Sequence, residues 1–401
     1  MRISGGTGRS FPTGGANDSP PPPSNSHRAA ALIIAALVLL AAFVLAVPYL
    51  SLALKQGYSF LSASSTTGPS TVTSMPSNTT STSGSTSSAT SSQCSSTVTV
   101  ENLAVPDIRN GSADIAYPSD YCTLAAYALG LINQDRGANG TGPITLDYNQ
   151  AAQQHADSML YYGYFSHFDT QGYKPYMRYS LLGGRGADFE NVAYYYFSAP
   201  HFFSSDTVES AIKELEYSMV YNDSSCCANG HRYNILGSLH NQVSIGVAYN
   251  STTVYFDEEF ENNYIDLNLS VAAASASDPY YVTLDGVPTG SFPNPGSLYV
   301  AFDGFPTATT SAQLNSGPHE YDPGTLVGGV LPRTVFFGEC GQFSSGTTVC
   351  ADTWKVTPKG IDIAFPLEPF IRDYGPGVYT LYLITGTSTD TAITSLSVFV
   401  P

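Results

Sequence analysis

Histidines and carboxylates in three separate segments are the residues of this chain best suited to bind a metal ion or move protons. His231 follows Gly230 in the run Asn-Gly-His-Arg-Tyr-Asn-Ile-Leu. His167 ends the run Tyr-Phe-Ser-His, and Glu190 begins the run Glu-Asn-Val-Ala. Neutral imidazoles bind zinc-like ions, and nearby carboxylates orient the imidazoles or activate a bound water. The sequence therefore predicts that folding gathers these side chains in one polar cleft.

These three runs, followed by Ile-Gly-Val-Ala from Ile245, resemble the CAP superfamily in their order and spacing. That family comprises cysteine-rich secretory proteins, antigen 5, pathogenesis-related 1 proteins and microbial SCP-domain proteins. The resemblance covers residues 122–265 and implies an α-β-α sandwich. It also implies a cleft tetrad of two histidines and two acids, in which His167, His231 and Glu190 take three positions.

The fourth tetrad position is harder to assign. The resemblance places a second acid on the helix before the Gly-His segment, one turn after a bulky aromatic residue. This chain has no tryptophan on that helix, and Glu209, Glu214 and Glu216 all compete. On a helical wheel Glu216 falls at the edge of the apolar stripe, whereas Glu214 points away. We therefore expect Glu216 to complete the cleft; a metal-dependent role weakens if no acid faces His231.

The cleft residues support three hypotheses of function. In the first, an extracellular protein binds a protein, glycan or lipid ligand through the cleft, with or without a divalent ion such as zinc. In the second, a metal-assisted hydrolase uses His167 and His231 as ligands and Glu190 or Glu216 as base. The third is a cell-surface spacer or adhesin that acts through its C-terminal strands. The sequence lacks a Gly-x-Ser-x-Gly elbow, a Walker loop and an HExxH motif, so binding is favoured over catalysis.

Helices and strands are mixed in the segment that carries these residues. Apolar residues recur at helical spacing from Cys122 onward, and His155 lies on the apolar face of the next helix, where we interpret it as a core histidine. This mixture predicts an α+β domain over residues 101–270. The expected elements after the first helix are helices at about Tyr148–Tyr162 and Asp206–Tyr221, and strands at Val243–Tyr249 and Thr253–Glu259.

Short strands divided by Gly and Pro turns predict a second domain over residues 278–401. The pattern is typical of an immunoglobulin-like β-sandwich. The candidate strands are Tyr280–Leu284, Ser297–Phe302, Thr334–Gly338, Val349–Val356, Gly360–Phe365, Gly377–Ile384 and Ile393–Phe399.

The N-terminal third has the composition of a membrane anchor and a stalk. Residues 1–28 predict a disordered cytoplasmic tail, and Ala29–Val47 contains no charged or polar side chain. A helix of that length rises roughly 28 Å, enough to span a bilayer, so we expect a transmembrane helix over residues 29–50 with the N-terminus inside. The alternative is a cleaved secretory signal. Residues 51–100 are rich in Ser and Thr and predict an extracellular stalk.

Charge and sequons agree with an extracellular location. The chain has 401 residues and a formal net charge of −17, which disfavours nucleic acid as a partner. Six Asn-x-Ser/Thr sequons lie beyond the predicted anchor, at Asn78, Asn110, Asn139, Asn222, Asn250 and Asn268.

The six cysteines predict disulfides in an oxidising compartment. Cys340 and Cys350 are close in sequence, so a local bridge is expected. Cys226 and Cys227 are adjacent, and a bond between them would be strained; we expect each to pair with a distant thiol, at Cys122 or Cys94. The rival interpretation is a Cys/His zinc site made by Cys226, Cys227 and His231.

Overall fold

The computed structural model describes residues 2–5, 121–198, 205–273, 280–291, 295–318, 320–334, 339–385 and 391–401. The expected membrane segment 29–50 and stalk 51–100 lie outside these residues, as does the expected disordered tail 1–28 except for strand β1 (Arg2–Gly5). Among the described residues, no helix is both long and apolar enough to cross a bilayer. The expectations for the N-terminal third therefore remain predictions.

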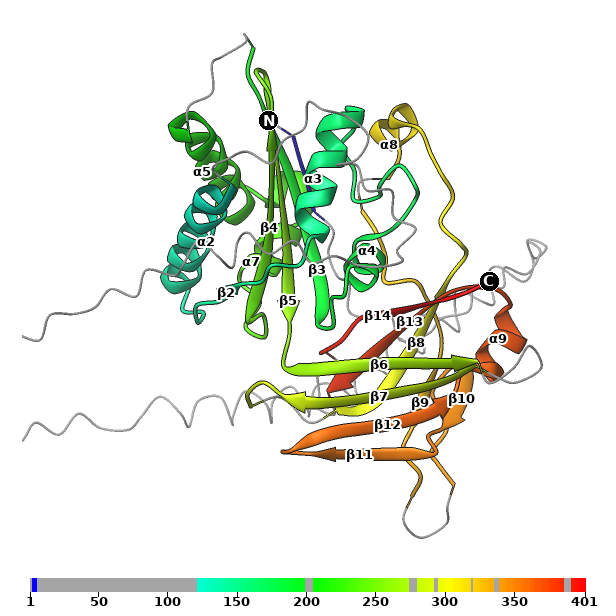
Figure 1. Cartoon of the computed structure of the whole chain (residues 1–401). Coiled ribbons are helices and arrows are strands. Elements are labelled where there is room, and N and C mark those ends of the chain that lie inside the picture. The colour runs from blue at the N-terminus through cyan, green and yellow to red at the C-terminus, as the bar shows by residue number, and fades with distance from the viewer. Residues whose placement is uncertain are drawn as a thin grey trace, which may run out of the picture. The chain divides into compact units, whose positions relative to one another are not determined.

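Residues 121–262 form helices on both faces of a five-stranded sheet (Figure 1). The strand order is β1-β3-β5-β4-β2, and β3, β5 and β4 pair antiparallel. The strands after β1 are β2 (Thr145–Leu146), β3 (Ala187–Tyr196), β4 (Gln242–Tyr249) and β5 (Thr253–Asn262). The helices are α2 (Tyr121–Ala138), α3 (Ala151–Tyr162), α4 (Pro175–Leu181), α5 (Ser205–Tyr221), α6 (Ser224–Cys227) and α7 (Gly230–Ile235).

Apolar stripes on α2 and α5 pack against one face of this sheet, and α3 packs against the other (Figure 1). Leu124 and Ile132 of α2 and Ile212 of α5 are fully buried in a core that includes Phe256 of β5. On the opposite face, α3 approaches β4 so closely at Gly246 that a Cβ there would lie 2.2 Å from the Ala152 carbonyl oxygen. These three layers confirm the expected α+β architecture.

Two further sheets share the core formed by the C-terminal residues. One has the order β10-β9-β8-β13-β14, and the other has the order β11-β12-β7-β6. The strands are β6 (Ile265–Ala273), β7 (Tyr280–Pro288), β8 (Pro295–Asp303), β9 (Thr325–Leu331), β10 (Thr347–Cys350), β11 (Thr353–Thr357), β12 (Gly360–Pro366), β13 (Gly377–Thr385) and β14 (Leu396–Val400). Helices α8 (Ser311–Ser316) and α9 (Glu368–Tyr374) lie between strands in sequence.

Some strands differ from the expectation. β6 already pairs with β7, so the C-terminal sheets begin at Ile265 rather than at residue 278. β9 was not expected, because Gly328 and Gly329 in its centre suggest a turn. Gly328 has φ 149°, and a Cβ there would lie 1.9 Å from the Thr347 carbonyl oxygen, so the close pairing with β10 requires glycine. The expected strand Val349–Val356 is divided between β10 and β11, and residues 335–338 of another lie outside the described residues.

The disulfides confirm one expected pairing and overturn another. Cys340 is bonded to Cys350, as expected. Cys226 and Cys227 are bonded to each other, so the prediction that each pairs with a distant thiol was wrong. Both thiols lie in the single turn of α6, and Cys122 is also disulfide-bonded.

Candidate functional site

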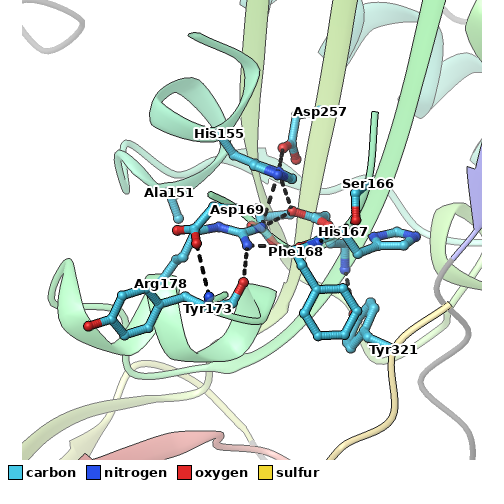
Figure 2. Close-up of polar contacts among 12 residues, drawn as sticks. Ala151, His155, Ser166, His167, Phe168, Asp169, Tyr173, Arg178, Asp257 and Tyr321 are labelled. Atoms are coloured by element: carbon cyan, nitrogen blue, oxygen red, sulfur yellow. Dashed lines mark hydrogen bonds and ion pairs between the residues drawn. The ribbon is translucent and has the colours of Figure 1, made fainter. Parts of the chain in front are cut away.

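Glu190 of β3 is the centre of a buried group of polar side chains. Figure 2 labels three of its partners, His155, His167 and Arg178. Oε2 of Glu190 lies 2.5 Å from Nδ1 of His167, and Oε1 lies 2.8 Å from Nδ1 of His155. The Arg178 guanidinium forms an ion pair with the same Oε1 through Nη2. Helix α3, the loop that follows it and helix α4 thus each place one cationic or basic group on this carboxylate.

Arg178 binds both the Glu190 carboxylate and the loop that carries His167. Its Nη1 donates to the carbonyl oxygens of His167 at 2.8 Å and Tyr173 at 2.9 Å. Burial by itself would raise the pKa of Glu190, but Arg178 and then His155 outweigh it and hold that pKa well below its usual range. Glu190 therefore stays ionised and orients His167, rather than acting as a base that exchanges protons near neutral pH.

His155 is buried, as expected of a core histidine, but its surroundings are charged rather than apolar. Its Nδ1 lies 2.9 Å from Oδ2 of Asp257 and also contacts Glu190. Burial and Arg178 both oppose a charge on this ring, yet the two carboxylates prevail and the pKa of His155 is raised. His155 therefore belongs to the polar group around Glu190.

Acidic side chains line the face of β3 and β5 that meets α3 and α4. The register places Asp188 opposite Glu261 and Glu190 opposite Glu259. Like charges at paired positions are destabilising unless protons or cations neutralise them. Burial raises the pKa of Asp188 to about 7 and raises that of Glu259 well above its usual range. A proton shared between these two carboxyls removes part of the repulsion.

The second expected imidazole, His231 of α7, is also held by a carboxylate. Its Nδ1 lies 2.5 Å from Oδ1 of Asp223, which is the residue two positions after α5. The amide of Asn191 on β3 donates to the His231 carbonyl at 3.3 Å, and Asn234 donates to Oδ1 of Asn191 at 2.9 Å. These bonds tie α7 to β3 immediately beside Glu190.

The structure does not place Glu216, the expected fourth residue, on His231. Glu216 is buried, and its carboxyl faces that of Glu258 on β5. Burial and the facing carboxyl raise the pKa of Glu216 well above its usual range. Burial raises the pKa of Glu258 to about 7, although hydrogen bonds with the Glu216 carboxyl and the Asn191 amide, and then the nearby His231, lower it. Glu216 and Glu258 form a carboxyl pair near the histidine, and Asp223 is the acid in contact with it.

The Nε2 atoms of the two expected histidines have no hydrogen-bond partner among the described residues. Nε2 of His167 and Nε2 of His231 are buried and unpaired among the described residues, and both side chains have 0 % exposure. Burial lowers the pKa of His167, and the charge of His231 lowers it further, so the two rings lie within electrostatic reach. A carboxylate on Nδ1 and a free Nε2 is the arrangement that metal-binding histidines usually show.

Two groups of three or more potential ligand atoms lie within 4.8 Å of one another in the described part of the chain. Neither group contains both His167 and His231, so a metal held by these two rings would need water or ligand atoms to complete its coordination. The first group is His155, Glu190 and Asp257; the second is Asp223, Cys226, Cys227 and His231.

The C-terminal residues also contribute to the site. The backbone N–H of Glu190 donates to the Tyr321 hydroxyl at 3.1 Å, and the ring centroids of Tyr321 and His167 are 5.0 Å apart. Two residues earlier, the N–H of Asp188 donates to Oγ of Ser395 at 3.1 Å. Figure 2 shows Tyr321 below His167, on a strand-free segment of the chain. The surroundings of Glu190 and His167 therefore depend on residues beyond the helical layers.

A cavity of about 340 Å³ opens beside the loop that carries His167. Four of its lining residues are large and apolar: Phe168, Met177, Phe305 and Leu314. The charged lining residues Lys174 and Asp303 bind each other at 2.8 Å, so the cavity offers an apolar wall with little net charge. Its volume lies in the range of small-ligand sites.

Sequence reasoning identified His167, Glu190 and His231, which the structure brings together, but missed Asp223, Arg178 and the functional surroundings of His155. Asp223 was missed because only residues inside the preceding helix were considered. The signal for it is position: it follows the helix end and stands eight residues before His231. The acids of β5 gave no usable signal, since carboxylates normally mark a solvent-exposed strand.

Residues 129–264 match the model of CAP, the cysteine-rich secretory protein family. A comparison with curated proteins gave no match.

Proposed function

Because residues 129–264 form a CAP domain, we propose that this protein binds an extracellular protein, glycan or lipid ligand through the cleft at His167 and His231, with a divalent ion such as zinc as part of the site. One observation supports this most: two buried imidazoles, each held at Nδ1 by a carboxylate, both present an unpaired Nε2. A buried nitrogen without a partner is costly, and a metal ion or a ligand donor would remove that cost.

A zinc titration of the full-length protein tests the metal part of this proposal. We expect saturable binding that His167→Ala and His231→Ala each weaken. His240 supplies a matched control, since it is a buried histidine bonded to Asn262 and away from the cleft. His240→Ala should leave zinc affinity unchanged. Equal affinity in all three variants would remove the metal from the proposal.

Ligand classes can be separated by binding screens with protein, glycan and lipid probes. Glu190→Gln removes the charge that orients His167, so binding through the cleft should be lost in this variant. The exposed residue Asp352 supplies the control, and Asp352→Asn should bind as the natural chain does. A ligand that binds both variants equally does not use the cleft.

Metal-assisted hydrolysis is the second candidate, and Glu258 favours it. A carboxyl with a pKa of about 7, in the electrostatic field of His231, can exchange protons at neutral pH. The ionised Glu190 cannot do so, and Glu216 would share its proton with Glu258. Turnover of ester, peptide or glycoside substrates that disappears in Glu258→Gln would support this candidate; turnover retained in that variant would exclude the assigned acid.

We also propose that the protein is anchored in a membrane by residues 29–50, with immunoglobulin-like C-terminal sheets outside the cell. The four sequon asparagines in the described residues, Asn139, Asn222, Asn250 and Asn268, are all exposed, as glycosylation requires. In an anchored chain with its N-terminus inside the cell, residues 2–5 could not reach β3, and the edge that β1 covers in this structure would be open to another polypeptide segment. A tag at the N-terminus should therefore resist protease added outside intact cells. Cleavage of the tag would contradict the proposed orientation.

A further inference from the structure

The backbone groups on the outer edge of β3 are paired in two ways: with side chains at one end of the strand and with strand β1 at the other. At the Asp188 end, side chains satisfy the backbone: Ser395 and Tyr321 accept from the N–H groups of Asp188 and Glu190, and Asn234 donates to the Glu190 carbonyl at 3.4 Å. In an antiparallel pair, outward-facing peptide groups recur at every second residue. The next outward-facing groups are therefore those of Val192 and Tyr194.

Strand β1 covers these remaining groups. It pairs antiparallel with β3, with Ser4 opposite Val192 and Arg2 opposite Tyr194. β1 also contacts α6 and α7, the helices that carry the Cys226–Cys227 bond and His231. An extended chain segment thus runs along β3 and beside α7, the helix that carries His231. In Figure 1 the blue strand lies behind α3 at the edge of the sheet.

We propose that this edge of β3 binds an extended, basic polypeptide segment of a partner by antiparallel strand addition, and that residues 2–5 occupy the place of that segment. This inference rests on the proposed function and names its ligand class. Main-chain hydrogen bonds supply the affinity in this mode of recognition, so the partner sequence is constrained mainly at a few positions.

Charge indicates what kind of polypeptide fits. The chain carries a net charge of −17, whereas residues 1–10 contain Arg2 and Arg9 and no acidic residue. Opposite charge speeds encounter and favours the correct partner. A proline at the position opposite Val192 would remove a required N–H donor, and the position opposite Asn191 is glycine in β1.

N-methylated peptides test the proposal. The probe is a fluorescent peptide with the sequence of residues 1–10, and the protein is the full chain lacking only residues 2–5. A methyl group on the Ser4 nitrogen blocks a bond to Val192, whereas one on the Ile3 nitrogen points away from β3. We expect the Ser4-methylated peptide to bind at least about tenfold more weakly and the Ile3-methylated peptide to bind within about threefold of the parent.

Two results would overturn the proposal: no saturable binding of the parent peptide, or an equal loss from the two methyl groups. The second result would mean that charge alone attracts the peptide. Zinc binding that depends on His231 is measured on the same protein. If it persists while the peptide fails to bind, strand addition is excluded and the proposed function of the cleft stands.

Discussion

Asp223 Oδ1 and His231 Nδ1 lie 2.5 Å apart, and this contact leaves Nε2 as the nitrogen of His231 without a partner in the described part of the chain. A ring held at Nδ1 by a carboxylate presents Nε2 to a metal ion or ligand. Because Glu216 instead faces Glu258, the two acids have different roles. His231 thus has an acid in contact with it, as a metal-dependent role requires, although it is not the expected one.

Substitutions at the two acids distinguish their roles. Asp223→Asn should weaken zinc binding roughly 10–100-fold, because the carboxylate behind a metal-binding histidine orients the ring and raises its basicity. Glu216→Gln should change zinc affinity by no more than about twofold. Isothermal titration of both variants measures the difference. A larger loss in Glu216→Gln than in Asp223→Asn would restore the assignment based on the helix pattern.

The buried acids predict that stability falls as pH rises. The pKa of Asp188 increases from 3.8 to about 7 and that of Glu258 from 4.5 to about 7, so the folded state binds more protons than the unfolded state between these values. The stabilisation is complete below pH 4 and is lost by about pH 7. We expect the melting temperature at pH 5 to exceed that at pH 8 by roughly 5–10 °C.

The double variant Asp188→Asn, Glu258→Gln should show a much smaller difference between these two pH values. Glu190 acts in the opposite direction, because its lowered pKa stabilises the fold only while it is ionised. That contribution is lost in strong acid, well below the window tested. A melting temperature that rises steadily from pH 5 to pH 8 would show that these carboxyls are ionised in the fold.

Arg178 should be the most important single cation for folding. Arg178→Met leaves Glu190 buried without its main counter-ion, and breaking a buried ion pair from one side costs roughly 3–5 kcal/mol. Arg333, which forms an exposed pair with Asp352, supplies the control, and Arg333→Met should cost at most about 1 kcal/mol. Urea unfolding measures both. Similar values for the two variants would mean that protons, rather than Arg178, neutralise Glu190.

Peptide mapping without reduction tests the disulfides. A fragment joining Cys340 to Cys350 and a fragment with an internal Cys226–Cys227 bond are expected. Cys340→Ser should lower the free energy of unfolding by about 2–3 kcal/mol, and Cys226→Ser by about 1 kcal/mol, because the second bond closes a much shorter loop. A fragment that links Cys226 or Cys227 to Cys122 would contradict the structure.

The sequence predicted the helices well and singled out three buried residues that the structure places in or next to one polar group, because both rest on local patterns. Helices α3 and α5 lie within a few residues of their expected bounds, since apolar spacing on one face is a strong signal. His167, Glu190 and His231 were found because each lies in a short run that resembles the family. Such runs do not predict the polar network around these residues, to which Arg178 of α4 and Asp257 of β5 contribute.

The acids of β5 show why the buried polar network could not be predicted from the sequence. Asp257, Glu258 and Glu259 are consecutive, and alternation would place some of them in solvent, yet all three have 0 % exposure. Helices cover both faces of the strand, so no side of it meets water. Only the tertiary packing reveals this, and a run of carboxylates reads as a solvent-exposed surface until the layers above it are known. Strand β9 was missed for a similar reason. Its glycines suggest a turn in the sequence, but in the structure Gly328 allows β9 and β10 to approach each other closely.

Tyr321 and Ser395 lie far downstream of the segment that matches the CAP family, but they complete the backbone of its edge strand. A recombinant fragment trimmed to the family boundaries would leave the amides of Asp188 and Glu190 bare, next to the very groups under study. Such a fragment would be prone to self-association, and a negative result obtained with it would say little about the intact molecule. Whoever dissects this protein should cut on the N-terminal side and keep the C-terminus whole.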